Sequence, residues 1–266
     1  MITASIVVHK SPEKQLSTAL ESLEKSSVDK IYVIDNSPED QLRDISEKYS
    51  KVQYLKVDNN GFGAGHNIAI KEALRNNTSF HLIMNADVWW EGDIIKPIYD
   101  FMKENPEVGM VSPKTFYPNG ELQYTCRMLP SPVDMFLRGF LPDKLKGKRN
   151  KKYLLEDFDH NHSLNCPYLL GSFMFFRTEA LREVGLFDER FFMYPEDIDI
   201  TRRIHEKWET IYWPKVSIIH EHQQASKKSI KMFWIHFTNM VKYFNKWGWF
   251  YDAKRKKYNK QLIGSI

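Results

Sequence analysis

The chain has 266 residues, of which 42% are hydrophobic and 27% charged, and these ordinary globular proportions exclude wholesale disorder and a collagen-like structure. The net charge is only +4. No run of 18 apolar residues occurs, and no basic region followed by a cleavage site stands at the N-terminus, so we expect neither a membrane-spanning helix nor a secretory signal. Two cysteines, Cys126 and Cys166, are too few for a disulfide framework or a four-thiolate zinc site, and a cytoplasmic location is expected.

The first 85 residues alternate between short apolar runs and segments with helical spacing. Such alternation predicts an α/β fold, in which helices cover a doubly wound, mostly parallel sheet. Ser11-Pro12-Glu13 has the composition of a helix start, with Ser11 as the cap. In chain order we predict strands at 4–9, 30–35, 52–55 and 81–84, and helices from Ser11 through Leu23, around 42–49 and over 68–74.

Polar residues follow several of these strands directly. In doubly wound sheets ligands bind outside the carboxyl ends of the strands, so we expect these side chains to meet in one crevice. They are Asp35, Asn36, Asn59, Asn60, Asn85 and Asp87.

The stretch Asn60-Gly61-Phe62-Gly63-Ala64-Gly65-His66-Asn67 places three glycines at alternate positions. It is not the dinucleotide-binding fingerprint G-x-G-x-x-G, because His66 stands where the third glycine is needed. The glycines allow a ligand to approach the backbone, and the following helix offers its N-terminal amides to a phosphate or hydroxyl. A tight strand-to-helix turn is the alternative interpretation.

Two further segments carry candidate metal ligands. Asn85-Ala86-Asp87 puts a carboxylate two residues from an amide oxygen, a pair that can hold a divalent cation, although an Asx turn or a helix cap explains it equally well. His220-Glu221-His222 ends an apolar run, and in an extended segment both histidines share one face. A two-histidine metal site and a structural or substrate-contacting histidine are the alternatives there.

Two charged segments follow the predicted sheet strands. Residues 140–162 are polar and rich in lysine, and we predict a mobile loop that is either an active-site lid or a solvated surface insertion.

Residues 187–199 carry five acids in thirteen positions among aromatic side chains. Pro195 suits a helix start, and Glu196 and Asp197 suit its first turn, so capping is one interpretation. Aromatic surroundings also desolvate carboxylates, which tunes them as bases.

Residues 227–260 form a basic, aromatic tail. Nine Lys and one Arg against one Asp give this segment a net charge of +9, which leaves −5 for the rest of the chain. We therefore divide the chain into a catalytic domain, residues 1–226, and a helical extension, residues 227–266, and we expect no nucleic-acid partner. Either the extension lies on an anionic membrane through its aromatics and the cluster Lys254-Arg255-Lys256-Lys257, or its apolar face packs on the domain or on a second copy in a homodimer. Both hold in part if 233–244 packs and 247–257 is exposed.

In this order, the motifs resemble those of glycosyltransferase family 2 enzymes with a GT-A fold, and especially the bacterial rhamnosyltransferase-like proteins of polysaccharide assembly. The similarity covers roughly residues 4–226. The matching pieces are Ile34-Asp35-Asn36-Ser37, the stretch from Asn60 to Asn67, Asn85-Ala86-Asp87, Gly171-Ser172-Phe173, the segment from Phe187 to Asp197, and His220.

The resemblance implies an inverting, metal-dependent hexosyltransferase. It would move a sugar from a nucleotide-diphosphate donor, dTDP-rhamnose or a UDP-sugar, to a hydroxyl of a polysaccharide or lipid-linked glycan at the inner face of the cell membrane. It also implies site residues. The general base would be Asp197 with Glu196 beside it, Asp87 and His220 would hold Mg²⁺ or Mn²⁺, Gly171 and Arg203 would support the site, and Asp35, Asn36, Asn60, Gly61, Asn67 and Asn85 would bind the nucleotide sugar.

Asn85 departs from the pattern of this family, in which many members carry Asp at that place. One carboxylate fewer implies weaker metal binding, or binding that depends on the nucleotide phosphates. It also keeps open a non-catalytic sugar-nucleotide-binding partner of another transferase, which the presence of Asp87, Asp197 and His220 opposes. A sugar-phosphate nucleotidyltransferase is a further alternative, although His9-Lys10-Ser11-Pro12 lacks the Gly-rich loop of that class.

Overall fold

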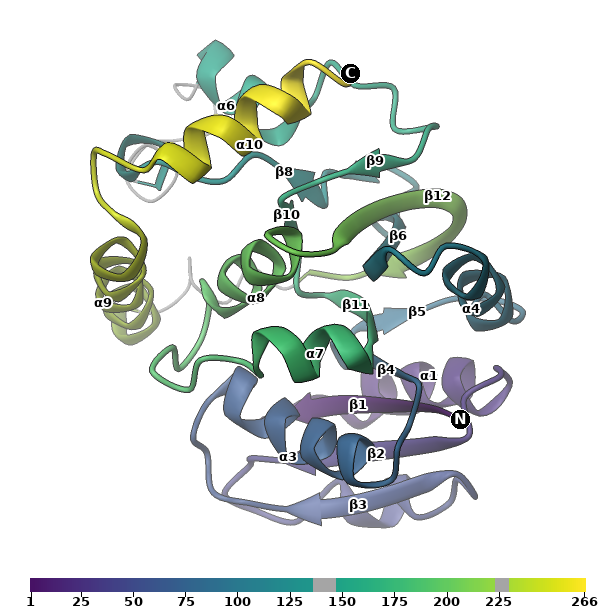
Figure 1. The fold of residues 1–266 in the computed structure, drawn as a ribbon. Coiled ribbons are helices and arrows are strands. Elements are labelled where there is room, and N and C mark those ends of the chain that lie inside the picture. The colour runs from purple at the N-terminus through teal and green to yellow at the C-terminus, as the bar shows by residue number, and fades with distance from the viewer. Residues whose placement is uncertain (136–146, 223–229) are drawn as a thin grey trace.

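The structure, a computed structural model, describes residues 1–135, 147–222 and 230–266 (Figure 1). Its first part is the predicted alternation, with four parallel strands in the order β3-β2-β1-β4. The predicted α/β fold class is confirmed. The elements of this part are β1 (Ile2–Val8), α1 (Glu13–Glu24), β2 (Lys30–Asp35), α2 (Arg43–Ser46), β3 (Val52–Lys56), α3 (Phe62–Arg75) and β4 (Phe80–Met84).

The second part extends the same sheet in the order β4-β11-β6-β12-β5. Because β11 is antiparallel to both β4 and β6, and β12 is parallel to β6, the strands β6 and β12 point the same way as β1 and β4. The elements of this part are β5 (Val88–Trp89), α4 (Ile95–Glu104), β6 (Val108–Phe116), β7 (Leu122–Gln123), β8 (Cys126–Arg127), α6 (Gly147–Leu154), β9 (Leu164–Asn165), β10 (Tyr168–Leu169), β11 (Phe173–Arg177), α7 (Thr178–Val184), α8 (Glu196–His205), β12 (Glu209–His220), α9 (Ile230–Trp247) and α10 (Ala253–Ile263).

Alternate residues of the central strands enter two separate cores. In β4, Leu82 packs into the core that α1 and α4 cover, whereas Ile83 packs into the core that α3, α7 and α8 cover. Phe175 and Phe176 of β11 divide in the same way. A sheet buried on both faces needs apolar residues at every strand position, which explains why these strands are continuous apolar runs in the sequence.

Some local predictions were wrong in detail. Pro12 rather than Ser11 occupies the cap position of α1, and no side chain caps that helix. The helix predicted around 42–49 is the single turn α2, and α3 begins at Phe62 because close packing outweighs the low helix propensity of its glycines. The segment 140–162 contains the helix α6, which buries Tyr153, so a loop was the wrong prediction for 147–154; residues 140–146 lie outside the described residues.

The helices α9 and α10 pack beside α8 (Figure 1). Met240, Tyr243 and Phe244 of α9 are buried in a cluster that includes Ile198 of α8, whereas Phe237 is 43% exposed. The extension therefore packs on the rest of the chain through part of its apolar face. None of the helices in the described ranges combines the length and apolar character that crossing a bilayer requires.

A buried ion pair joins the extension to α8. Arg202 donates two hydrogen bonds of 2.7 Å to Asp252, the side chains are 1% and 3% exposed, and the guanidinium lies 4.0 Å from the ring centre of Trp247. Arg255, which we expected in an exposed basic cluster, is buried and donates to the carbonyl oxygens of Gly248 and Trp249, so that expectation was wrong. Its guanidinium satisfies backbone acceptors in the turn between α9 and α10.

Candidate functional site

Parallel strand ends bring the predicted site residues to one edge of the sheet. Asp35 is the last residue of β2, Asn85 follows β4, and His220 is the last residue of β12. Because β2, β4 and β12 point the same way, their carboxyl ends share this edge. The first turn of α8, with Glu196 and Asp197, is linked to the same edge by the segment that precedes β11.

The carboxylate of Asp35 is fully buried and already bonded within the protein. It accepts hydrogen bonds from the amide of Ser37 at 2.7 Å and from the hydroxyl of Tyr54 at 2.5 Å, and the ammonium of Lys56 lies 3.6 Å away. The neighbouring Asn36 is buried too, but its side-chain oxygen finds no hydrogen-bond partner in the described part of the chain. Contact of this pair with a base and ribose stays a prediction, and Asn36 has the acceptor that such a contact needs.

The glycines of the 60–67 stretch are required by close packing. A Cβ at Gly61 would lie 2.2 Å from the carbonyl oxygen of Phe192, and φ of Gly61 is +104°, a backbone conformation that glycine favours. A Cβ at Gly63 would lie 2.9 Å from the side chain of Phe187, and a Cβ at Gly65 would lie 2.8 Å from the side chain of Val7 in β1. The tight turn accounts for Gly61, and close packing accounts for Gly63 and Gly65, which lie within α3. Asn60 at the start of the stretch is exposed.

Asn67 clamps the acidic segment onto α3. Its side-chain oxygen accepts from the amide of Phe187 at 3.0 Å, and its NH₂ donates to the carbonyl of Phe187 at 3.0 Å and to Glu189 at 2.9 Å. These bonds engage both ends of its amide. Asn67 thereby holds the segment that leads to Asp197, and its contact with a sugar nucleotide stays a prediction.

Asp87 and His220 face each other at the end of β4 and β12. The Nε2 atom of His220 lies 3.4 Å from a carboxylate oxygen of Asp87 and 3.5 Å from the side-chain nitrogen of Asn85. Burial raises the pKa of Asp87, but the hydrogen bond and charge of His220 outweigh it and hold this pKa below its usual value. The extended segment ends at His220, and His222 beyond it has a φ of +48°, with its ring centre 5.2 Å from that of His220.

The second ring nitrogen of His220 identifies a residue that the sequence analysis missed. Its Nδ1 lies 2.7 Å from Oε1 of Gln123 in β7, and both side chains are buried. Since an amide oxygen only accepts, His220 donates from Nδ1 to Gln123, so Nε2 is the ring nitrogen that faces Asp87, and a cation bound between them would replace the proton on Nε2. No sequence signal marks Gln123, because β7 has only two residues and lies 97 residues away.

Replacing Gln123 is therefore expected to weaken the binding of a cation by His220. Gln123→Met keeps the size of the side chain but removes the acceptor, and we expect the Mn²⁺-dependent part of nucleoside diphosphate affinity to fall roughly 10- to 100-fold. Calorimetric titration with and without Mn²⁺ measures this. Gln123→Glu retains the acceptor and should lose less, and Gln53→Met at an exposed position of β3 is the control. Unchanged affinity in Gln123→Met would contradict the role.

Asp197 is a buried carboxylate with three donors around it. It accepts from the amides of Gly171 at 3.1 Å and Ile198 at 2.8 Å, and from the hydroxyl of Tyr168 at 3.3 Å. Burial raises its pKa to about 6, against the lowering effect of these hydrogen bonds and of the charge on Arg127. A carboxylate with this pKa is ionised at neutral pH and is a stronger base than an exposed aspartate.

Glu196, beside it, is buried and electrostatically different. Burial and the charge of Asp197 raise the pKa of Glu196 well above its usual value. Its Oε2 atom has no hydrogen-bond partner among the described residues. The start of α8 thus carries two buried carboxyl groups, both with a raised pKa.

Gly171 and Ser172 connect the two halves of the site. The amide of Gly171 donates to Asp197, and the carbonyl of Ser172 accepts from the amide of Asn85 at 3.0 Å. A Cβ at Gly171 would lie 2.9 Å from Cβ of Asp197, so only glycine allows this approach. Two consecutive residues therefore hold the carboxylate of α8 beside the Asn85–Asp87 turn.

Arg203 fixes α8 from the side away from Asp197. It pairs with Asp199 at 2.9 Å and donates to the carbonyl oxygens of residues 184–186, at the end of α7 and just beyond it. Asp199 in turn accepts from the indole of Trp247 at 2.8 Å and the ammonium of Lys246 at 2.7 Å in α9. Arg203 thus positions the helix without reaching the edge of the sheet.

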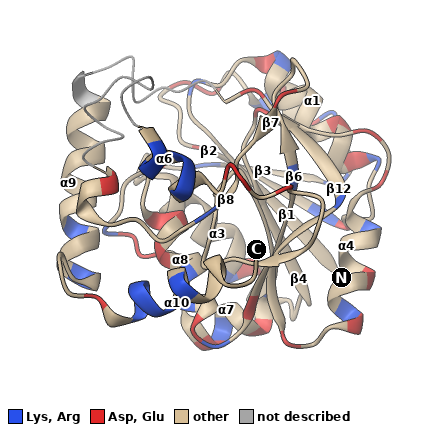
Figure 2. Cartoon of the chain, turned by 90° about the horizontal axis from the view of Figure 1, so that it is seen from above, with Lys and Arg blue, Asp and Glu red and all other residues tan. Residues whose placement is uncertain are grey.

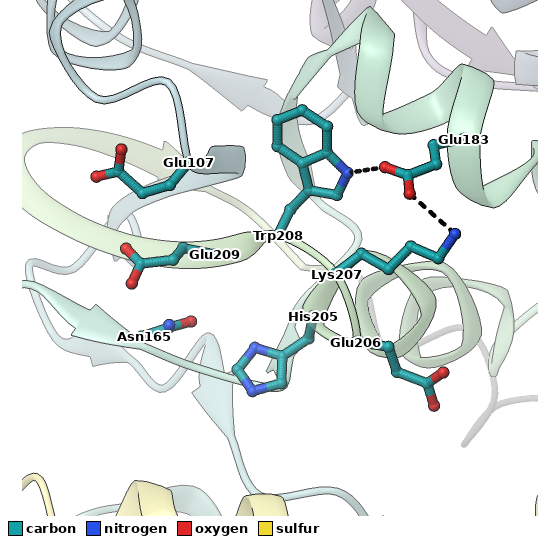
Figure 3. A pocket seen from close by; sticks show the side chains of 8 residues that line it. All are labelled: Glu107, Asn165, Glu183, His205, Glu206, Lys207, Trp208 and Glu209. Atoms are coloured by element: carbon teal, nitrogen blue, oxygen red, sulfur yellow. Dashed lines mark hydrogen bonds and ion pairs between the residues drawn. The ribbon is translucent and has the colours of Figure 1, made fainter.

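An open hollow lies at the opposite, amino ends of β6 and β12, where Glu183 pairs with Lys207 and Trp208 (Figure 3). It holds none of the predicted site residues. Within the described ranges no group of three or more His, Cys, Asp and Glu side chains is placed to hold a metal ion, so Asp87 and His220 stand as a pair. The residues around the hollow are Glu107, Asn165, Glu183, His205, Glu206, Lys207, Trp208 and Glu209.

Comparison with known proteins agrees with this geometry. The chain matches the family described as Glycosyl transferase family 2 over residues 3–185. N-acetylglucosaminyl-diphospho-decaprenol L-rhamnosyltransferase of Mycobacterium tuberculosis is 28% identical over 141 residues, which are 52% of this chain and 46% of that protein. Rhamnosyltransferase WbbL of Escherichia coli K12 is 27% identical over 206 residues, 75% of each chain. The chain therefore spans about half the length of the first of these relatives.

Among solved structures, GalNAc-T7 with UDP, GalNAc and Mn²⁺ is similar with a TM-score of 0.62 and 16% identity, over 82% of this chain and 43% of that one. At this identity the likeness shows the fold alone. The predicted GT-A fold is thereby confirmed.

Proposed function

The chain belongs to glycosyltransferase family 2, and from that premise we propose that it is an inverting glycosyltransferase with Asp197 as its base. One observation carries the proposal. Gly171 and Ser172 hold Asp197, whose pKa is raised to about 6, beside the turn that contains Asp87. A base and a site for a charged leaving group are the two parts that such a transfer requires.

In the proposed reaction Asp197 accepts the proton of an acceptor hydroxyl. The acceptor oxygen forms a bond to the anomeric carbon as the bond from that carbon to the diphosphate breaks, and the diphosphate leaves with the bonding electrons on the opposite face. The configuration of the sugar is thereby inverted. Asp197 must be ionised to act, so transfer should decline as the pH falls through about 6.

Asp87 and His220 fit a divalent cation, Mg²⁺ or Mn²⁺. A carboxylate oxygen and the Nε2 atom of the histidine face each other at 3.4 Å, and Gln123 engages Nδ1, so Nε2 is the nitrogen placed to bind a cation. A bound cation would neutralise charge on the leaving diphosphate. With only two protein ligands, we expect the affinity to depend on the nucleotide phosphates, as the Asn85 departure also implies.

The donor and acceptor follow from the relatives as proposals. The names of two relatives describe rhamnosyl transfer, and one names a lipid-linked acceptor. We propose dTDP-rhamnose or a UDP-sugar as donor, and a lipid-linked glycan as acceptor, reached from the cytoplasmic face of a membrane. A non-catalytic partner of another transferase would bind the donor without turnover.

The test combines binding and turnover. We expect Mn²⁺ with dTDP or UDP to raise the melting temperature of the protein, and the nucleotide that raises it more names the base of the donor. Nucleoside diphosphate should then be released from the matching sugar nucleotide when a glycan acceptor is added. Stabilisation without release would favour the non-catalytic partner. The absence of both stabilisation and release would contradict both interpretations.

A further inference from the structure

We propose that α6, α10 and the turn that precedes α10 form a docking face for an anionic lipid bilayer. This inference rests on the proposed lipid-linked acceptor and names the surface that would bring the chain to it. We call this surface the lysine–aromatic face. It comprises Lys148, Lys151 and Lys152 of α6, Phe250 and Tyr251 of the turn, and Lys256, Lys257 and Lys260 of α10.

The two helices of this face are neighbours although about 100 residues separate them. Tyr153 and Leu154 of α6 share one apolar cluster with Tyr258 of α10, and Figures 1 and 2 show the helices on the same side of the molecule. In Figure 2 both carry blue segments toward the viewer. The two lysine-rich helices therefore contribute their charges to the same side of the molecule.

The exposed aromatic residues are held in place by the protein. Phe250 and Tyr251 are 89% and 88% exposed, the highest values among the exposed large apolar side chains. Buried Arg255 donates to the carbonyls of Gly248 and Trp249, and Asp252 accepts from the amide of Arg255. These hydrogen bonds fix the backbone of the turn, and its two aromatic rings remain in solvent.

Within the described ranges, few acidic side chains pair with the charges on this face. Arg149 is paired with Asp134 and Lys254 with Glu206, so neither is counted in the face. The six lysines of the face are all exposed, and neither helix contains an acidic residue. Glu156 and Asp157 follow α6 and reduce but do not cancel this excess.

A lipid surface fits this combination better than a protein groove or a nucleic acid. Lysines attract the face to anionic headgroups, and two aromatic rings insert at the headgroup level, which are the two signals that stable peripheral binding needs. The face is also coupled to the site, because Arg202 of α8 pairs with Asp252 at the base of the turn. Docking would therefore set the orientation of α8, and of Asp197 on it, relative to the bilayer.

Co-sedimentation of the full chain with vesicles tests this inference. We expect binding to phosphatidylcholine vesicles that contain phosphatidylglycerol, no binding to pure phosphatidylcholine, and release by salt. Lys151→Glu with Lys152→Glu, and Lys256→Glu with Lys257→Glu, should each weaken partitioning at least roughly 25-fold, since each lysine contributes about fivefold. Phe250→Ser with Tyr251→Ser should weaken it at least roughly tenfold.

The matched control is Lys48→Glu with Lys103→Glu, which makes the same charge change at exposed positions outside the face. This control should bind vesicles within about twofold to threefold of the native chain. Equal loss in the control, or no binding of the native chain at low salt, would overturn the inference. Donor binding and nucleoside diphosphate release are measured separately, by melting shifts and by turnover, so failure of the proposed transferase function would show there and not in the vesicle assay.

Discussion

Asp197→Asn is expected to reduce sugar transfer by a factor on the order of 10² to 10⁴ while donor binding remains. The substitution keeps the size of a buried side chain and one of its acceptor oxygens, but it removes the only group in this position that can take a proton. Steady-state transfer and calorimetric donor binding measure the two effects. The native enzyme should also show an acid limb near pH 6 in kcat/KM.

The same substitution is also expected to change how the unfolding free energy depends on pH. The pKa of Asp197 is raised from 3.8 to about 6 on folding, so its favourable contribution is complete below pH 3.8 and is lost as the pH rises through 6. Between pH 4 and pH 7 the native protein should therefore lose about 2 kcal/mol of unfolding free energy relative to Asp197→Asn. Urea unfolding at the two pH values measures this difference.

A true helix cap provides the control. Asp93 accepts hydrogen bonds from the amides of Ile95 and Lys96 at the start of α4, so Asp93→Asn changes a capping carboxylate in the same way without touching the site. It should leave transfer unchanged. If Asp197→Asn also transferred sugar at the native rate, Asp197 would be a cap of the same kind, and the base assignment would fail.

Asp87→Ala is expected to abolish the contribution of a cation to nucleotide binding. Asp87 supplies the only carboxylate of the proposed pair, so we expect the affinity for nucleoside diphosphate in Mn²⁺ to fall on the order of 10²-fold, to the metal-free value. His220→Ala should weaken it less, because the carboxylate remains. Titration of each protein with and without Mn²⁺ gives the comparison.

Asp44→Ala, at an exposed position of α2, is the control for loss of a negative charge. Its metal-dependent affinity should equal that of the native chain. Equal affinities of the native chain with and without Mn²⁺ would exclude Asp87 and His220 as ligands together, whatever the variants do.

The parts of the fold that could be predicted from the sequence are those in which local pattern and tertiary packing agree. β2 runs from Lys30 to Asp35 as predicted, because its apolar residues are buried on both faces and its polar end lies at the sheet edge. α6 was missed because three of its eight residues are exposed lysines, and a single buried Tyr153 gives no periodic signal. Arg255 was misplaced because a basic cluster does not reveal which of its members turns inward.

The candidate site divides in the same way. Asp87, Asp197 and His220 could be singled out because each follows a strand or begins a helix, and such positions are visible in a sequence. Gln123 could not be singled out, because it lies 97 residues from His220 and only the folded chain brings the pair together. Gly171 was expected from the family resemblance alone, since its contact with Asp197, 26 residues away, leaves no local pattern in the sequence.

Gly61 has a consequence for how this chain can change over evolutionary time. Two independent demands fix glycine there, a φ of +104° and the carbonyl of Phe192 at the place of a Cβ. Asparagine, which tolerates positive φ better than most residues, would still clash with a backbone atom that no substitution at 192 removes. Any side chain at this position requires the backbone at Phe192 to move, so Gly61 is expected to be retained while the exposed parts of the loop change.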